Sequence, residues 1–152
     1  MPEVNGYTAY KADLHTHTIY SDGDCTPEYR VKEAWNNGLD VLAITEHVEY
    51  RKHEGKLIAF LKGYMPEGVK AVNHNVINKA ANEQGILSDL NTAVKLAQKS
   101  AKDYGITIIP GAEITREPVS IGHYNALFTE DNNILYDTDP MQSMLNAKKQ
   151  GA

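Results

Sequence analysis

Two kinds of apolar pattern alternate along the chain. Short apolar runs predict buried strands over 39–44 and 106–109, and a mixed apolar run predicts another over 121–128. The Tyr- and Thr-rich segment 6–12 predicts an earlier strand. Segments with apolar residues at helical spacing predict helices over 27–37, 88–104 and from Asp139-Pro140 onwards.

Capping residues define the ends of these helices. Thr26 and Ser88 are the expected N-caps of the first two helices, and Asp139 is the expected N-cap of the last. Gly38 and Gly105 are the expected stops. The faces expected to be buried contain Val31, Ala34 and Trp35 in the first helix and Met141, Met144 and Leu145 in the last.

The order of these elements indicates an α/β fold with a parallel sheet and right-handed crossovers. The segment from 48 to 87 has weaker patterns, with short helices expected near 54–62 and 75–84. We expect residues 1–152 to form one domain. Four strands are about half of a closed (β/α) barrel, so the chain is expected to be the N-terminal half or more of such a barrel.

Composition narrows the classes of partner. The formal charge of −5 disfavours nonspecific binding to the phosphates of nucleic acid, although bound metal ions can reverse the charge locally. No apolar run approaches about 18 residues, so no membrane span is expected. Cys25 is the only cysteine, which excludes a disulfide framework and a Cys-rich zinc site. We expect a soluble, cytoplasmic protein, with a removed export leader left open as the alternative.

Histidines and carboxylates follow the predicted strands. His15 and His17 have the i, i+2 spacing that places two imidazoles on one face of an extended chain. Ligands gather beyond the carboxyl ends of parallel strands. The remaining candidates are Asp22, His47 after the second strand, Glu113 after the third, and His123, whose place at the start of the fourth does not fit this rule. Imidazole with carboxylate suits zinc, iron or manganese better than magnesium.

Four sequence blocks resemble the PHP (polymerase and histidinol phosphatase) superfamily, and most of all its small stand-alone metal-dependent phosphoesterases. They are Asp-Leu-His-Thr-His-Thr with Ser-Asp-Gly, then Gly-Leu-Asp-Val-Leu-Ala-Ile-Thr-Glu-His, then Pro-Gly-Ala-Glu-Ile, then Gly-His-Tyr-Asn. The blocks span residues 13–125 in the order found in that family. The resemblance implies a distorted, TIM-like (β/α)7 barrel with two or three divalent metal ions at the top of its strands.

The resemblance also implies metal ligands. His15 and His17 would hold one ion that Glu113 bridges to a second, and His123 would share that second ion. Asp22 and His47 would hold another. The family usually has Asp where Glu46 precedes His47, a position that is generally not a ligand. A later His and a final Asp-x-His pair of the family pattern are expected beyond residue 152.

The implied activity is hydrolysis of a small phosphorylated metabolite, with hydroxide generated from a metal-bound water attacking phosphorus. Glu113 and His47 are the expected catalytic residues, and Arg116 and Arg51 are candidates for binding the substrate phosphate. Asp13 is a candidate for orienting an imidazole. Two alternatives remain: an amidohydrolase-type C–N hydrolase, which also opens with His-x-His, and a metal-binding module without catalysis.

Overall fold

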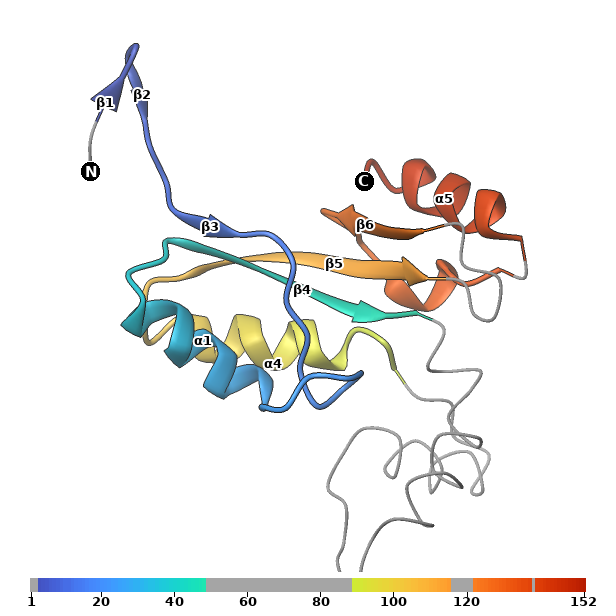
Figure 1. Cartoon of the computed structure of the whole chain (residues 1–152), viewed down its shortest axis with the longest axis horizontal. Coiled ribbons are helices and arrows are strands. Elements are labelled where there is room, and N and C mark those ends of the chain that lie inside the picture. The colour runs from blue at the N-terminus through green and yellow to red at the C-terminus, as the bar shows by residue number, and fades with distance from the viewer. Residues whose placement is uncertain (1–2, 49–88, 116–121, 138) are drawn as a thin grey trace, which may run out of the picture.

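The computed structural model describes residues 3–48, 89–115, 122–137 and 139–152. Its main sheet has four strands in the order β3-β4-β5-β6 (Figure 1). These are β3 (Ala12–Asp13), β4 (Val41–His47), β5 (Thr107–Thr115) and β6 (His123–Leu127). The helices are α1 (Pro27–Asn36), α4 (Thr92–Ala101), the 3-10 turn η1 (Asn132–Ile134) and α5 (Pro140–Lys149).

Several predicted features lie outside the described residues. They are the short helices near 54–62 and 75–84, the Ser88 cap, Arg51 and Arg116. In the described part of α4, Asn91 occupies the N-cap position and its side chain makes no capping hydrogen bond. None of the helices in the described ranges is long and apolar enough to cross a membrane.

The prediction of one strand over 6–12 is wrong. The chain forms a small hairpin of β1 (Glu3–Val4) and β2 (Tyr7–Thr8), and only Ala12–Asp13 joins the main sheet. Asn5 and Gly6 link the two hairpin strands with φ values of 53° and 81°. Asn-Gly favours such a two-residue turn because both residues tolerate positive φ. The turn pairs Tyr7–Thr8 with Glu3–Val4, so the first part of the predicted strand belongs to the hairpin and not to the main sheet.

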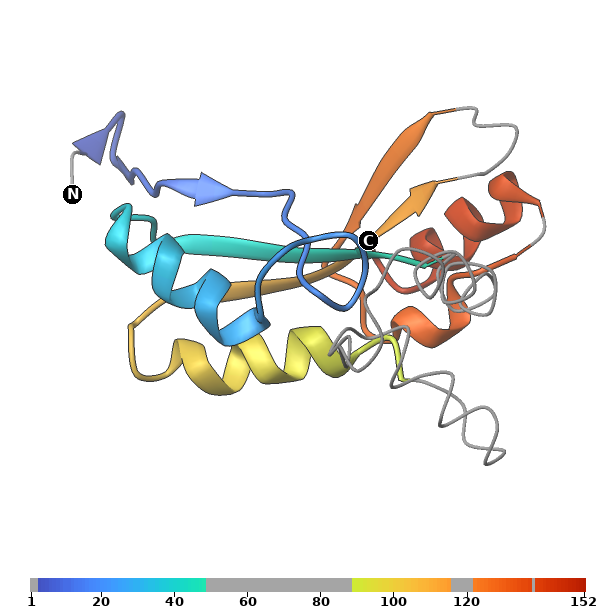
Figure 2. The ribbon, with the colours of Figure 1, turned by 60° about the horizontal axis from the view of Figure 1, so that its bottom comes forward.

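The sheet is curled and mixed rather than fully parallel (Figure 2). Strand β4 pairs in parallel with β3 and with β5, whereas β6 pairs antiparallel with β5. A parallel crossover needs a dozen or more residues, and the chain has only residues 116–122 between β5 and β6. This reversal corrects the placement of His123: it pairs with Thr115 and so lies at the same end of the sheet as the carboxyl end of β5.

Helices α1 and α4 lie side by side against one face of the sheet (Figures 1 and 2). The first core cluster lies between these two helices and the sheet. It comprises Val31, Ala34, Leu42, Ile44, Ala93, Val94, Ala97, Ala101 and Ile106. Thr26 caps α1 as predicted, since its side chain accepts a hydrogen bond from the Tyr29 amide. Trp35 was expected on the buried face but is 52% exposed, with its ring 5.5 Å from that of Tyr104.

Helix α5 belongs to a second core cluster with the distal part of β5. Its members are Val48, Leu90, Ala112, Ile114, Ala126, Leu135 and Ala147. The predicted cap is confirmed, because the Asp139 side chain accepts from the Met141 amide. The predicted buried face is confirmed only at Met144, which packs against this cluster, and is wrong at Met141 and Leu145, which are 58% and 47% exposed. The helix buries Ser143 and Ala147 instead, small residues that permit close packing.

We predict that Gly111→Ala loosens β6 from β5. A Cβ on Gly111 would lie 2.7 Å from the Ala126 carbonyl oxygen, which is backbone and cannot turn aside. Overpacking of this kind costs about 1–3 kcal/mol. Denaturant unfolding measures the loss. A variant as stable as the wild type would show that the two strands are not in this close contact.

Candidate metal centre

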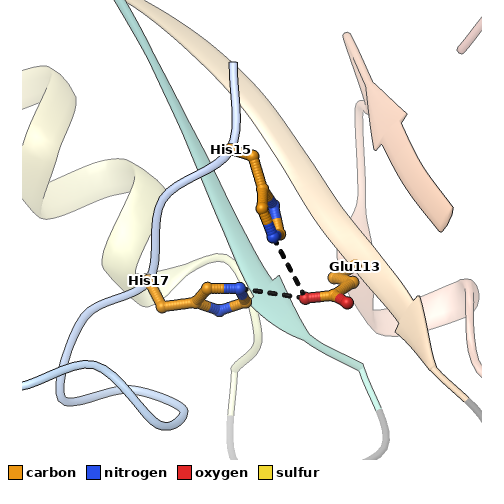
Figure 3. Close-up of side chains that lie close together, drawn as sticks. All are labelled: His15, His17 and Glu113. Carbon is orange, nitrogen blue, oxygen red and sulfur yellow. Dashed lines mark ion pairs between the residues drawn. The ribbon is translucent and has the colours of Figure 1, made fainter. Parts of the chain in front are cut away.

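Glu113 lies at the middle of a group of four imidazoles. Its side chain is only 2% exposed, and its Oε2 atom is 2.9 Å from His17 Nε2, 3.7 Å from His15 Nε2 and 3.5 Å from His47 Nδ1. The other oxygen, Oε1, contacts His123 Nδ1. Figure 3 shows His15 and His17 converging on one Glu113 oxygen. The carboxylate therefore joins side chains from distant parts of the sequence.

Strand register places His47 beside Glu113. The two residues are direct partners in the parallel pairing of β4 and β5. Side chains alternate between the faces of a strand, so His47 points away from the face on which Leu42 and Ile44 pack against the helices. Glu113 shares this second face because register partners point the same way.

His15 and His17 come from a segment that follows β4 beyond the end of β3. The Thr16 amide donates to Thr45 Oγ1 at 3.1 Å, and the Thr45 amide donates to the Thr16 carbonyl at 3.0 Å. Thr16 is buried between the two histidines, whose ring centroids are 4.8 Å apart. The prediction that the two imidazoles project side by side is confirmed.

A second group of ligand atoms is formed by His17, Asp22 and His47. Asp22 Oδ2 is 3.3 Å from His47 Nε2, and Asp22 Oδ1 is 3.4 Å from His17 Nδ1. The loop that carries Asp22 folds back tightly, because the Gly23 amide donates to the Thr18 carbonyl at 2.9 Å. A Cβ on Gly23 would lie 2.5 Å from the His17 carbonyl group, so only glycine fits there.

The donor set fits divalent cations. Two ligands that are each about 2.1 Å from an ion in tetrahedral geometry are roughly 3.4 Å apart, and the nitrogen–oxygen distances around Glu113 Oε2 run from 2.9 to 3.7 Å. Burial lowers the pKa of His17, and the neighbouring His47 lowers it further. A lowered pKa favours the neutral imidazole, which is the form that binds metal.

Comparison with known proteins agrees with this geometry. The family model of the PHP domain matches residues 13–149. The chain belongs to the PHP domain family. No curated protein matches it.

Two solved structures extend the comparison. One is a two-domain protein from Bacteroides vulgatus that contains a predicted PHP-like metal-dependent phosphoesterase; it is 36% identical, with a TM-score of 0.72 over 100% of this chain. The other, from Bifidobacterium adolescentis, is named as a candidate metal-dependent phosphoesterase; it is 22% identical, with a TM-score of 0.50 over 95% of this chain. The chain spans only 36% and 35% of the lengths of these two proteins.

The PHP domain uses supporting residues that the sequence patterns did not single out. Thr45 Oγ1 is 2.9 Å from His15 Nδ1, and Ser21 Oγ is 3.0 Å from His17 Nδ1. Asp13 does not orient an imidazole, since its carboxylate accepts from the His15 backbone amide at 3.2 Å. The spacing of Thr45 and His47 on one face of β4 is a signal that could have revealed Thr45.

Glu46 is a buried carboxyl next to the candidate ligands of the PHP domain. It accepts hydrogen bonds from the Thr18 amide at 2.9 Å and the Thr18 hydroxyl at 2.6 Å, and it contacts the Ser21 hydroxyl. Burial raises the pKa of Glu46 from 4.5 to about 7, because desolvation outweighs these hydrogen bonds.

We predict that Thr45→Val destabilises the PHP domain and loosens His15, whereas Thr45→Ser does not. Thr45 is fully buried, and its hydroxyl accepts from the Thr16 amide and donates to the Thr16 carbonyl. Valine would leave that amide without its partner, at a cost of about 1–3 kcal/mol. Chemical denaturation of both variants tests this. Equal losses in the two would show that the hydroxyl is not the important group.

The raised pKa of Glu46 predicts a pH-dependent stability in metal-free protein. Between pH 4.5 and about 7 the folded chain keeps a proton that the unfolded chain has lost, so stability falls as pH rises. The fall is about 3 kcal/mol, since one pKa unit corresponds to about 1.4 kcal/mol. Glu46→Gln lacks this proton. The difference in unfolding free energy between wild type and variant should change over this range, and parallel pH curves would contradict the assignment.

Proposed function

We propose that this PHP domain is part of a metal-dependent phosphoesterase that hydrolyses a small phosphorylated metabolite. The observation that supports this best is the buried Glu113, whose two oxygens lie against imidazoles from three separate chain segments. Such a donor set suits zinc, manganese or iron better than magnesium. No nucleic acid or membrane is required as a partner.

The proposed ligands divide among two or three ions. His15 and His17 would hold the first ion together with Glu113. Glu113 would bridge to a second ion that His123 shares. Asp22 and His47 would hold a third, in keeping with the 3.3 Å between their nearest atoms.

Ions held there would supply a water of lowered pKa and positive charge for the phosphoryl oxygens. This charge matters because the chain carries a formal −5 and two of the proposed ligands are carboxylates. Glu113 and His47 are the proposed catalytic residues, since both belong to the candidate ligand groups and their nearest side-chain atoms are 3.5 Å apart. Arg116, which follows β5 directly in sequence, and Arg51 are proposed to bind the substrate phosphate.

The proposal extends to the architecture of the whole domain. We propose that the curled sheet is part of the distorted (β/α)7 barrel of the family, with residues 1–152 supplying its N-terminal half or more. The similar proteins are nearly three times as long, which leaves ample chain for further strands. Those strands would supply the later His and the Asp-x-His pair of the family pattern.

The test is hydrolysis of p-nitrophenyl phosphate by the full-length protein after removal of metal and after addition of manganese, zinc, iron or magnesium. We expect activity to be lost on chelation and restored by one of the first three. Glu113→Gln keeps the shape of the side chain but removes its charge, and we expect at least a hundredfold loss of kcat/KM, or about 2.7 kcal/mol.

Asp103→Asn is the matched control, because it neutralises an exposed carboxylate beyond the end of α4. It should retain wild-type activity. Cleavage of p-nitroacetanilide without cleavage of the phosphate ester would favour an amidohydrolase. Bound metal with neither activity would favour a module without catalysis.

A further inference from the structure

His17 is the residue on which the two groups of candidate ligands overlap. Its Nε2 atom is 2.9 Å from Glu113, in the group that contains His15. Its Nδ1 atom is 3.4 Å from Asp22, in the group that contains His47. A neutral imidazole has one lone pair and one N–H, so the position of its proton decides which group it joins.

Ser21 is the nearest hydrogen-bonding partner of His17 Nδ1, at 3.0 Å. A hydroxyl has a single proton to donate. When Glu46 is ionised, the Ser21 hydroxyl donates that proton to Glu46 Oε2, with which it makes a short contact. Ser21 can then only accept from His17, so Nδ1 must be the nitrogen that carries the proton.

The orientation of Glu46 is fixed from its other side. The Thr18 amide can only donate, and it donates to Glu46 Oε1 at 2.9 Å. The Thr18 hydroxyl also donates to this oxygen, at 2.6 Å, and itself accepts from the Tyr20 amide at 3.2 Å. Glu46 Oε2 is therefore turned towards Ser21 as an acceptor, and every hydrogen bond in this chain runs in one direction.

We infer that Glu46 and Ser21 are positioning residues that hold His17 in its Nδ1–H tautomer and thereby assign its Nε2 lone pair to the ion shared with His15 and Glu113. This assignment excludes His17 from the Asp22–His47 ion. It rests on the candidate metal centre and not on phosphoesterase activity. Glu46 thus acts at the centre without being a ligand, through hydrogen bonds alone.

Two further contacts agree with this tautomer. Asp22 Oδ1, 3.4 Å from His17 Nδ1, is a carboxylate oxygen and so also favours a proton on that nitrogen. Glu113 Oε2, 2.9 Å from His17 Nε2, favours a proton on Nε2 when no ion is bound, so the Nδ1–H tautomer belongs to the centre with its ion in place. Arg30 fixes the backbone of the same residue, because its Nε and Nη2 atoms donate to the His17 carbonyl at 3.2 and 3.0 Å. The ring is therefore held by Ser21 and its main chain by Arg30.

Glu46→Gln is the sharpest test because it should reverse the chain of hydrogen bonds. The Thr18 amide would still require an oxygen, so the new amide nitrogen would face Ser21 and donate to it. The Ser21 proton would then be free for His17 Nδ1, the nearer of its two remaining acceptors. A wrong tautomer set by such an isosteric change is a known route to inactivation in catalytic triads.

The tautomer is read directly from ¹⁵N shifts and two-bond ¹H–¹⁵N correlations of His17 in the zinc-loaded, full-length protein above neutral pH, because without an ion the Glu113 carboxylate 2.9 Å from Nε2 favours a proton on that nitrogen. We expect Nδ1–H with zinc on Nε2 in the wild type, and a lower population of this form in Glu46→Gln and, to a smaller extent because Asp22 remains beside Nδ1, in Ser21→Ala. Zinc or manganese affinity should fall about 10- to 100-fold in both variants. Glu130→Gln removes an exposed carboxyl beyond the far end of β6 and should change neither quantity.

Circular dichroism establishes that each variant is folded. Ser21→Ala adds no polar group to the interior, so it gives an independent result if Glu46→Gln does not fold. A zinc-loaded wild type with His17 protonated on Nε2 would overturn the inference. An unchanged tautomer with unchanged metal affinity in the folded variants would overturn it as well, whatever the phosphatase assay shows.

Discussion

A carboxylate buried in a curled sheet is the constraint that organises this domain. An ionised group loses several kcal/mol of hydration on burial unless positive charge or hydrogen-bond donors replace the water. Glu113 is buried where the register of β4 and β5 brings His47 beside it and the antiparallel β6 brings His123 to it. The neutral form of His17, favoured by its lowered pKa, does not supply that charge. Divalent cations held by the candidate ligands would supply it.

Three consecutive residues of β4 serve the centre in different ways because side chains alternate along a strand. His47 is a candidate ligand, and Thr45 on the same face is hydrogen-bonded to His15. Glu46 points the other way, where the loop after the first histidines passes, and it contacts Ser21 and Thr18. A substitution of Thr45 therefore acts on His15, and one of Glu46 acts on His17 through Ser21.

The order of elements, most helix caps and the grouping of His15, His17, His47 and Glu113 follow from periodicity and strand-end logic. Glu113, however, was predicted to follow its strand and lies inside β5, which continues to Thr115. The errors have local causes. The Asn5-Gly6 turn pairs the first part of the predicted strand with Glu3–Val4 in a hairpin, and residues 116–122 are too few for a parallel crossover, which reverses β6. Met141 is exposed because α5 packs through small residues. Ser21 and Glu46 were missed because their roles depend on hydrogen-bond directions that a sequence does not display.

Folding and metal binding are coupled in such an arrangement. The candidate ligands come from the segment after β3, from β4, from β5 and from β6, so the complete site exists only when these pieces are assembled. Any ion that binds the folded form alone stabilises it by mass action. Without ions, the same fold still brings Asp22 and Glu113 close to the imidazoles of His17 and His47. Only contacts with the protein then offset the loss of hydration of these two carboxylates. The supporting hydrogen bonds from Thr45 and Ser21 keep the ligands in place through that metal-free state, which is why small hydroxyl side chains matter here as much as the ligands themselves.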